Sequence, residues 1–374
     1  MQYRYITKDK LKVSQLGFGT MRFPIINNDS SLIDEDKTKE MFDYAIENGV
    51  NYIDTAYNYH QGKSETFIGK YLKNGLREKV YLTTKLPVWL VETYDDFERL
   101  LDEQLEKLQT DYIDFYLLHS LHEKPWRKIA DLNVFKFLKE AKEKGKIKYV
   151  GFSFHDEFSL FKGIVDSFDW DICQIQLNYL DRDYQAGLKG LSYAKEKDIS
   201  VVIMEPIKGG KLADPPNDIL KIWDANEIKR SPAEWALRWL YNLDDISIVL
   251  SGMSTMEQVM ENIETASTAT SLTHKETKLI DKVTAVYKDK VKVGCTGCEY
   301  CLPCPSNVSI PNIFALYNDM FVYGTVNESK ESYKKLIELE KAVNNCVECG
   351  ACEDICPQHL NVIELLKEAE KAMI

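Results

Sequence analysis

Short apolar runs alternate with amphipathic stretches from residue 15 to residue 270, and this rhythm predicts an α/β fold, a TIM (β/α)8 barrel. A second observation concerns the tail, because eight of the nine cysteines fall between residues 295 and 356. The chain has 374 residues, which leaves room for a small second domain after a barrel of about 250 residues. We therefore expect a barrel followed by a small C-terminal α-helical domain.

Eight short apolar runs are the candidate strands of this barrel. They alternate with amphipathic stretches, and this rhythm favours a parallel sheet that helices cover. The expected strands are residues 16–19, 52–55, 80–85, 112–119, 149–153, 172–178, 200–205 and 247–250.

Helical patterns fall between these strands, for example at residues 37–48, 94–108, 134–144, 232–241 and 256–267. Ser254 and Glu257 have the spacing of a capping box at the start of the last of these helices. Residues 3–13 precede the first strand, and we expect them to form a hairpin across the bottom of the barrel.

Two runs of cysteines dominate the tail, and their spacing is typical of iron-sulfur ligands. Thiolates three residues apart on a tight turn can bind three corners of a 4Fe-4S cluster, while the last cysteine of such a run reaches a second cluster. Zinc is the alternative, since paired CxxC motifs also form tetrahedral sites, and disulfides are another. The runs are CTGCEYCLPCP (Cys295, Cys298, Cys301, Cys304) and CVECGACEDICP (Cys346, Cys349, Cys352, Cys356), and the first is one residue shorter before its last cysteine.

The pattern changes after an expected helix at residues 275–287, so we place the domain boundary near Asp289. Residues 1–289 would then form the barrel and residues 290–374 a ferredoxin-like iron-sulfur domain with helices at 313–323 and 330–344. The apolar core of so small a domain is thin, so ligation of the clusters should supply much of its stability.

Charge and hydropathy exclude some functions. The 47 basic and 59 acidic residues give a formal net charge of -12, which would repel phosphate backbones and argues against a nucleic-acid partner. No apolar run approaches the roughly 20 residues that a membrane helix needs, so no membrane is expected. No hydrophobic signal peptide opens the chain, which favours a cytoplasmic location and disfavours disulfides.

Polar residues close several expected strands, where a barrel of this kind places its chemistry. Asp54 ends the second strand, Tyr59 follows five residues later, Lys85 ends the third and His119 ends the fourth. A charged lysine beside a tyrosine is expected to lower the pKa of the phenol, while a carboxylate holds the lysine in place. Singly, each residue could be a cap, a solvated charge or a core side chain; together, on successive strand ends, they predict a catalytic group.

At this point the sequence resembles the aldo-keto reductase family. The segments NYIDTAYNY (51–59), LTTKL (82–86) and DFYLLHS (114–120) are similar to its aspartate-tyrosine motif, its lysine strand and its histidine strand, in the family's order. The resemblance spans about three quarters of the chain. It implies that Asp54, Tyr59, Lys85 and His119 are the catalytic tetrad, with Tyr59 as general acid in carbonyl reduction by a nicotinamide hydride.

The same resemblance implies cofactor contacts. Ser153 and Gln174 match positions that hold the nicotinamide ring, although Phe154 and His155 follow the serine where relatives often have Asn. The segment EPIKGGKL (205–212) offers Lys208, Gly209 and Gly210 to a pyrophosphate. The segment SGMSTMEQVMEN (251–262) places Gly252, Ser254, Gln258 and Asn262 at a helix N-terminus, a natural anion site.

The family's NADPH-selective members carry basic residues that clamp the 2'-phosphate in this last segment. Gly252 and Gln258 stand at the corresponding positions here. A preference for NADPH is therefore not implied, and NADH and FMN remain alternatives.

The tail resembles helical two-cluster ferredoxins that are fused to some aldo-keto reductases of anaerobes. In that type the fourth cysteine of each run serves the cluster of the other run. The resemblance implies one 4Fe-4S cluster on Cys295, Cys298, Cys301 and Cys356 and a second on Cys304, Cys346, Cys349 and Cys352.

Iron-sulfur clusters transfer single electrons whereas nicotinamide transfers a hydride, so coupling the two halves requires a converter such as a flavin. The leading hypothesis is an oxidoreductase that reduces a carbonyl-type small molecule in the barrel, with two clusters supplying or removing electrons and with room for a redox partner protein. The alternative is a redox-sensing or electron-carrier protein whose barrel binds nucleotide with little turnover and whose clusters are structural.

Overall fold

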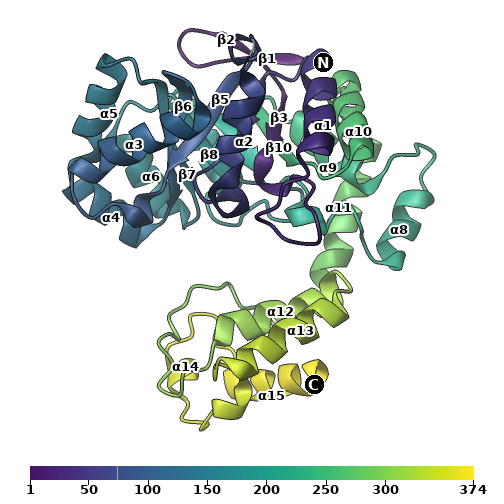
Figure 1. The fold of residues 1–374 in the computed structure, drawn as a ribbon. Coiled ribbons are helices and arrows are strands. Elements are labelled where there is room, and N and C mark those ends of the chain that lie inside the picture. Colours follow the sequence, from purple (N-terminus) through teal and green to yellow (C-terminus); the bar gives the residue numbers. More distant parts are fainter. Residues whose placement is uncertain (74) are drawn as a thin grey trace. The chain divides into compact units, whose positions relative to one another are not determined.

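The computed structural model describes residues 1–73 and 75–374 (Figure 1). They form two compact units, the first containing residues 1–210 and 233–273 and the second residues 211–232 and 274–374. The second unit thus includes two segments that precede the expected boundary at residue 289. The reason is local packing, because α8 (Asn217–Asp224) packs against α11 (His274–Asp289), and Lys290 pairs with Asp218 at 2.8 Å.

A closed barrel of eight parallel strands forms the first unit, in the order β10-β3-β4-β5-β6-β7-β8-β9. Strand β10 pairs with β3 and closes the barrel, with Leu250 opposite Gly17. All eight predicted strands are confirmed, with small shifts at their ends. They are β3 (Leu16–Gly19), β4 (Tyr52–Asp54), β5 (Tyr81–Leu86), β6 (Ile113–Leu121), β7 (Ile147–Phe154), β8 (Ile172–Gln176), β9 (Ser200–Met204) and β10 (Ile246–Gly252).

The floor of the barrel is a hairpin, as predicted. Strands β1 (Tyr3–Ile6) and β2 (Leu11–Ser14) pair antiparallel, and their side chains Ile6 and Val13 pack in one buried cluster with Tyr52, Phe115 and Ile172 from the barrel strands. This apolar layer closes the N-terminal end of the strands. The polar residues that end the strands therefore lie at the opposite end.

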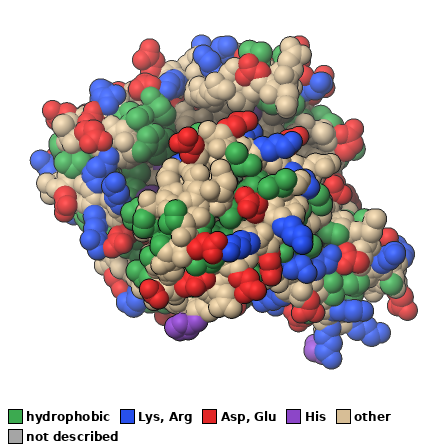
Figure 2. Space-filling model, turned by 90° about the horizontal axis from the view of Figure 1, so that it is seen from below, with side chains coloured by type: hydrophobic (Ala, Val, Ile, Leu, Met, Phe, Trp, Pro, Cys, Tyr) green, Lys and Arg blue, Asp and Glu red, His purple; other side chains and the backbone are tan. Residues whose placement is uncertain are grey.

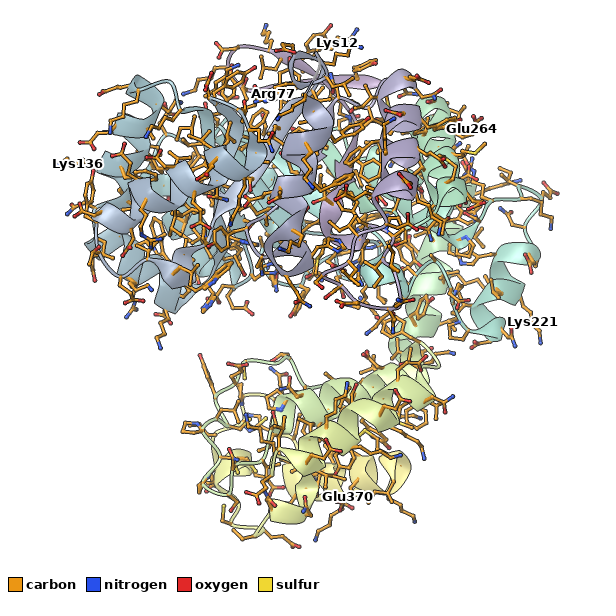
Figure 3. The ribbon with its side chains drawn as sticks, in the orientation of Figure 1. Lys12, Arg77, Lys136, Lys221, Glu264 and Glu370 are labelled. Atoms are coloured by element: carbon orange, nitrogen blue, oxygen red, sulfur yellow. The ribbon has the colours of Figure 1, made fainter. Side chains whose placement is uncertain are left out.

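Arg77, labelled in Figure 3, ties strands together near this floor. It pairs with Asp114 at 2.7 Å and donates hydrogen bonds to the carbonyl oxygens of Val80 and Tyr112, which precede β5 and β6. The N-terminal end of the barrel is thus held by a buried ion pair and apolar packing, which leaves the other end for binding.

Helices cover the outside of the strands, and the helical patterns predicted for this unit are confirmed. The predicted capping box is wrong by one residue, because Thr255 caps the last helix by accepting from the Gln258 amide, and the Gln258 side chain accepts from the Ser254 amide. The helices are α1 (Glu35–Glu47), α2 (Lys63–Leu72), α3 (Asp95–Leu108), α4 (Glu123–Asp131), α5 (Val134–Glu143), α6 (Phe158–Ser167), α7 (Gly187–Glu196), α9 (Pro232–Tyr241) and α10 (Met256–Thr268); the short 3-10 turns are η1 (Thr20–Arg22), η2 (Tyr59–Gly62), η3 (Arg77–Lys79), η4 (Val88–Leu90) and η5 (Lys208–Gly210).

The second unit is helical and has its own apolar core, which includes Ile313, Phe314, Tyr333 and Leu366. Glu370, labelled in Figure 3, accepts a hydrogen bond of 3.1 Å from Tyr333 within this unit. Besides α8 and α11 it contains α12 (Ile310–Val322), α13 (Val326–Glu338), η6 (Val343–Asn345), α14 (Ala351–Asp354) and α15 (Val362–Met373).

The helix predicted at residues 330–344 is placed too far along the chain. Helix α13 ends at Glu338, and Glu340 adopts a left-handed conformation with φ 54° that a helix cannot continue through. The chain then turns toward Cys346.

Acidic and basic side chains are interspersed over the face drawn in Figure 2, with apolar side chains between them. Among the helices that the structure describes, none is both long enough and apolar enough to cross a membrane.

Candidate functional site

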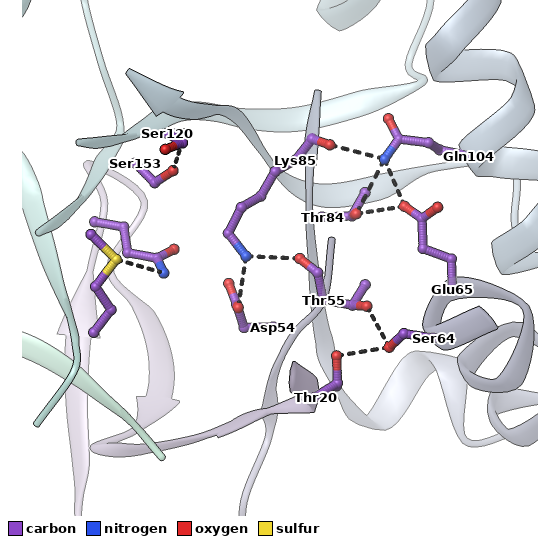
Figure 4. Close-up of polar contacts among 12 residues, drawn as sticks. Thr20, Asp54, Thr55, Ser64, Glu65, Thr84, Lys85, Gln104, Ser120 and Ser153 are labelled. Carbon is purple, nitrogen blue, oxygen red and sulfur yellow. Dashed lines mark hydrogen bonds and ion pairs between the residues drawn. The ribbon is translucent and has the colours of Figure 1, made fainter. Parts of the chain in front are cut away.

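A buried ion pair lies at the C-terminal end of β4 and β5 (Figure 4). Lys85 Nζ is 2.7 Å from Asp54 Oδ1 and donates a second hydrogen bond of 2.8 Å to the Thr55 carbonyl oxygen. The side chains of Lys85 and Asp54 are 1% and 3% exposed. Burial lowers the pKa of Lys85, but Asp54 and Tyr59 outweigh it and the net pKa is raised, so the ammonium stays charged.

A further group of buried polar side chains hydrogen-bonds the backbone of Lys85 and the side chain of its neighbour Thr84. The sequence analysis did not predict this group. Gln104 donates to the Lys85 carbonyl oxygen at 3.0 Å and to Glu65 Oε1 at 2.6 Å, and Thr84 donates to the same Glu65 oxygen at 2.7 Å (Figure 4). Burial raises the pKa of Glu65. Glu65 and Gln104 are polar, yet they occupy positions on the buried faces of α2 and α3 that apolar residues normally fill. This departure from the apolar pattern was the signal in the sequence that could have revealed them.

Tyr59 lies next to the ion pair because the chain leaves β4 and turns through η2, which begins at this residue. Lys85 Nζ is 5.0 Å from the centroid of the Tyr59 ring. The expected lowering of the phenol pKa is wrong: burial raises it, and this effect outweighs the opposing effect of Lys85. The phenol therefore keeps its proton at neutral pH.

His119 near the end of β6 completes the group. Its ring centroid is 6.2 Å from that of Tyr59, and its Nδ1 is buried without a hydrogen-bond partner among the described residues. Burial, followed by Lys85 and His155, holds the pKa of His119 well below its ordinary value. The four residues predicted to act together are thus brought together, with a charged lysine and a neutral histidine.

Ser153 and Gln174 lie on adjacent strands, β7 and β8, in register with each other. The Ser153 hydroxyl accepts from the Ser120 amide at 2.6 Å (Figure 4), and the Gln174 amide nitrogen lies 3.7 Å from Met204 Sδ. Gln174 Oε1 is buried and has no partner in the described part of the chain. A buried acceptor of this kind fits a ligand that offers an N-H group, such as a carboxamide or a flavin ring.

The loop after β9 contains the predicted Lys208, Gly209 and Gly210. Both glycines have positive φ, 64° and 100°, so the backbone turns in a way that favours glycine. Lys208 Nζ forms an ion pair with Asp181. The loop therefore has the predicted shape, while the charge of its lysine is already neutralised by Asp181.

The segment from the end of β10 into α10 contains Gly252, Ser254, Gln258 and Asn262. Ser254 Oγ donates to the carbonyl oxygen of Arg22 at 2.7 Å, and Asn262 donates to Ser251 Oγ at 3.0 Å. Gln258 is engaged with the start of α10, as described above. Ser254 and Gln258 shape the N-terminal turn of α10, where amide groups favour an anion. The prediction that Asn262 lies at this N-terminus is wrong, because Asn262 is buried in the middle of the helix.

Trp89 on η4 is suited to contact a substrate. It is 41% exposed, and its ring centroid is 5.2 Å from that of His119. Phe23 is 3% exposed and stacks on His60, so it belongs to the core, and Trp126 packs against Phe135.

The cysteines of the two runs line two cavities in the second unit. One cavity is lined by Cys304, Cys346, Cys349 and Cys352, together with Cys301. The other is lined by Cys295, Cys298, Cys301 and Cys356, together with Cys352. Each cavity thus contains three cysteines of one run and the last cysteine of the other, and the two cavities share Cys301 and Cys352.

These residues fit iron-sulfur clusters better than the alternatives. All nine cysteines are free, so no pair forms a disulfide. Across residues 1–73 and 75–374, no group of three or more His, Cys, Asp or Glu side chains is arranged to hold a single metal ion. Four sulfurs around a cavity, rather than around one point, suit a cluster whose irons bind one thiolate each.

Comparisons with known proteins agree with this geometry. The model of the Aldo/keto reductase family matches residues 15–285, and that of the 4Fe-4S dicluster domain matches residues 294–361. Protein tas of Escherichia coli is 27% identical over 328 residues, covering 71% of this chain and 92% of that protein. The NADH-specific methylglyoxal reductase of E. coli is 27% identical over 259 residues, covering 58% of this chain and 78% of that protein.

The solved structure of the aldo-keto reductase AKR11C1 from Bacillus halodurans, in its holo form, is 30% identical in sequence with a TM-score of 0.63. It covers 76% of this chain and 96% of that chain. The closed barrel and the two cysteine-lined cavities lead to the same conclusion: the chain belongs to the aldo/keto reductase family of oxidoreductases and carries a C-terminal 4Fe-4S dicluster domain.

Proposed function

We propose that the barrel reduces a small carbonyl compound, with Tyr59 donating the proton and a nicotinamide nucleotide donating the hydride. The observation that carries this proposal is the buried Lys85–Asp54 pair beside a phenol that keeps its proton. A proton donor must be protonated before the reaction and must have its conjugate base stabilised during it. The fixed ammonium of Lys85 supplies that stabilisation.

Tyr59, Lys85 and His119 have separate roles in the proposed reaction. A nicotinamide nucleotide, when bound, supplies the hydride that adds to the carbonyl carbon. Tyr59 transfers its proton to the carbonyl oxygen, so that the carbonyl becomes an alcohol, and Lys85 stabilises the resulting phenolate. Neutral His119 has a buried nitrogen that no described residue hydrogen-bonds, and this nitrogen can hydrogen-bond the same oxygen, which orients the substrate.

Gln174 and Ser153 would hold the ring of the nucleotide, and the loops after β9 and β10 its phosphates. The relative named NADH-specific methylglyoxal reductase supports a small carbonyl substrate and is compatible with NADH. FMN remains the candidate when electrons pass between the barrel and the clusters, because a flavin exchanges both single electrons and hydride equivalents.

We further propose that the two clusters carry electrons rather than only stabilising their domain. The adjacent cysteine-lined cavities, which share Cys301 and Cys352, support two centres close enough to exchange electrons. A redox partner protein or a flavin in the barrel would complete the path. Nine free cysteines suit a reducing compartment, and we propose a cytoplasmic location on that basis.

Replacing the proton donor tests the proposal. Tyr59→Phe in anaerobically purified protein should lower carbonyl turnover by about 10²- to 10⁴-fold. Tyr57→Phe is the matched control, since Tyr57 lies two residues away and its hydroxyl contacts Glu103 instead. If both variants turn over carbonyl substrates at the wild-type rate, Tyr59 is not the donor.

A visible spectrum tests the cofactors separately. Clusters should give a broad absorption at about 400 nm. Denaturation of the same sample should release flavin into the supernatant if FMN is the converter. Colourless protein that contains zinc would contradict the proposed electron path, and absence of released flavin would leave nicotinamide as the cofactor.

A further inference from the structure

His60 follows Tyr59 directly in the chain, and it is buried, with 8% of its surface exposed. Its ring connects two loops. Nδ1 lies 2.9 Å from the carbonyl oxygen of Ser30, and Nε2 lies 3.1 Å from the carbonyl oxygen of Thr20. The ring also stacks on Phe23, with centroids 5.4 Å apart and planes inclined by 22°. His60 therefore joins the loop after β4 to the segment between β3 and α1.

Both ring nitrogens of His60 face oxygens that can only accept a hydrogen bond. Each contact therefore needs an N-H group on the ring. A neutral imidazole has one N-H group and donates to one of the two carbonyl groups at a time, whereas the doubly protonated ring donates to both. An apolar side chain at this position would leave both buried carbonyl groups without this donor, which costs free energy.

The backbone that follows Tyr59 is strained. His60 has φ 52° and ψ 44°, Gln61 has φ 53° and ψ 38°, and Gly62 has φ 84°. This left-handed conformation costs a residue with a Cβ roughly 1–2 kcal/mol, and it persists only where the surrounding structure holds it. The side chains of the two strained residues provide such contacts, because Gln61 Nε2 donates to Ser30 Oγ at 2.9 Å and His60 contacts the Ser30 carbonyl.

The start of α2 is attached to the same segment. Ser64 Oγ lies 2.9 Å from Thr20 Oγ1 and 2.9 Å from Thr55 Oγ1 (Figure 4). The turn η2 thus runs from Tyr59 to a helix that is fixed at its first residues. Because His60 shares a peptide bond with Tyr59, any movement of the His60 backbone moves the backbone of Tyr59 as well.

We infer that His60 is a positioning residue, which fixes the Tyr59 phenol beside Lys85 through its contacts with the carbonyl oxygens of Thr20 and Ser30. This inference rests on the proposed function, in which Tyr59 donates the proton. A proton donor must lie within hydrogen-bond reach of the oxygen that it protonates, and a displacement of about 1 Å can cost about 10²-fold in rate. His60 acts on the reaction only through the backbone of Tyr59.

Three variants of the full-length, anaerobically purified protein separate the contacts of His60. His60→Phe keeps a ring that can stack on Phe23 and removes both N-H donors. His60→Asn places an amide donor near the position of Nδ1, and asparagine adopts the left-handed conformation more readily than most residues. His60→Gln places an amide donor near the position of Nε2.

Gln15→Leu is the matched control. Gln15 is 3% exposed and donates a hydrogen bond of 2.6 Å to the carbonyl oxygen of Ala266. It directly precedes β3, at the opposite end of the strands from Tyr59. Its replacement therefore also removes a buried bond from a side chain to a backbone carbonyl, but at a distance from the proton donor.

The first readout needs no substrate. Fluorotyrosine in place of Tyr59 gives a single reporter for fluorine NMR, and with His60 present it should show one narrow resonance. In His60→Phe this resonance should shift and broaden or split, because the strained turn relaxes and the ring takes more than one position. His60→Asn and His60→Gln should deviate less, since each keeps one donor. Gln15→Leu should lower the unfolding midpoint and leave the resonance unchanged.

The second readout is the reduction of methylglyoxal by NADH. His60→Phe should lower kcat by about 10- to 100-fold. KM should change little, because the proton is transferred only in the transition state, so kcat and kcat/KM should fall together. His60→Asn or His60→Gln should recover part of the rate. A variant that had only lost stability would regain the full rate at lower temperature, where it is folded.

The two readouts separate this inference from the proposed function. If His60→Phe lowers the unfolding midpoint but leaves the resonance at position 59 unchanged, His60 is only a structural residue and the inference is overturned, while the proposed function stands. If the resonance shifts but Tyr59→Phe reduces methylglyoxal at the wild-type rate, the positioning role stands and the proposed proton donor is wrong.

Two further cases are decided by the resonance alone. If the wild type does not reduce methylglyoxal, the shift in His60→Phe still supports the positioning role and its absence overturns it. If His60→Phe does not fold, His60→Asn and His60→Gln, which each lack one contact, should show smaller shifts. A wild-type resonance in both of these variants would overturn the inference.

Discussion

Lys85 and Asp54 form an ion pair of 2.7 Å in which neither side chain is more than 3% exposed. Lys8 and Asp169 form a pair of the same length on the surface, with side chains 63% and 83% exposed. The geometry of the two pairs is alike, but their surroundings differ. Water and salt screen the exposed pair, whereas a buried charge that loses its partner has no solvent to replace it.

Asp54→Asn should therefore lower the free energy of unfolding by about 3–5 kcal/mol, since it leaves the Lys85 ammonium buried and uncompensated. Asp169→Asn should leave the unfolding midpoint almost unchanged. Urea titrations followed by the fluorescence of the buried Trp170 and Trp235 measure both variants. Equal effects of the two substitutions would show that Lys85 is not charged in the folded barrel.

The lowered pKa of His119 predicts a stability that depends on pH. The unfolded chain takes up this proton near pH 6.5, whereas the folded chain takes it up only at lower pH. As the pH falls below 6.5, the unfolded state binds the proton first, so the free energy of unfolding should fall by up to about 1.4 kcal/mol per pH unit.

Comparing variants isolates the contribution of His119 to the pH dependence of stability. Asp54 and Glu65 have raised pKa values and affect stability in the opposite direction as the pH rises, but they are present in every variant. His119→Gln should therefore flatten the decline between pH 6.5 and the folded pKa of His119, while His274→Gln, which changes an exposed histidine, serves as the control. His155, whose pKa is also lowered, should retain its own smaller contribution.

The positions of Asp54, Lys85 and His119 could be predicted from sequence because each lies at or near the end of a buried apolar run. A closed parallel barrel brings such strand ends together whatever the loops do. The same rule does not predict the positions of Gln104 and Glu65, because they lie on helices. The sequence does not show how each helix is rotated about its axis, and so it does not show which side chains face the strands. Their hydrogen bonds to Thr84 and to the Lys85 carbonyl become visible only after packing.

The expectation for Tyr59 failed for a related reason. The sequence shows a lysine that lowers the phenol pKa, but it does not show how much water the fold removes from the ring, and burial is the larger effect. Gly252 was predicted to lie at an anion site, and the structure shows that it also leaves room for the Arg22 side chain, which the sequence does not reveal.

Replacement of glycine by alanine should have opposite effects on stability at two positions. A Cβ on Gly151 in β7 would lie 2.2 Å from the Ile172 carbonyl oxygen in β8, so Gly151→Ala must separate two paired strands and should destabilise the barrel by at least about 1–3 kcal/mol. A Cβ on Gly163 in α6 would have no described atom within 4 Å apart from its chain neighbours and the backbone of its own helix, so Gly163→Ala should stabilise by about 0.5–1 kcal/mol through helix propensity. Thermal unfolding of both variants checks the register of β7 and β8. A harmless alanine at position 151 would mean that these strands pair differently.

Paired cysteine replacements test which thiolates share a cluster. Cys298 and Cys356 come from different runs but line the same cavity, whereas Cys349 lines the other. Removing Cys298 and Cys356 together should abolish one cluster and leave roughly half of the iron and acid-labile sulfide. Removing Cys349 and Cys356 together should abolish both clusters, because each cluster then lacks a ligand. Cys173→Ala should keep the full iron content, since Cys173 is buried in β8 of the barrel. If each run instead held its own cluster, the Cys349/Cys356 pair would retain half of the iron and the Cys298/Cys356 pair would lose it all, so the two double variants decide between the arrangements without reference to turnover.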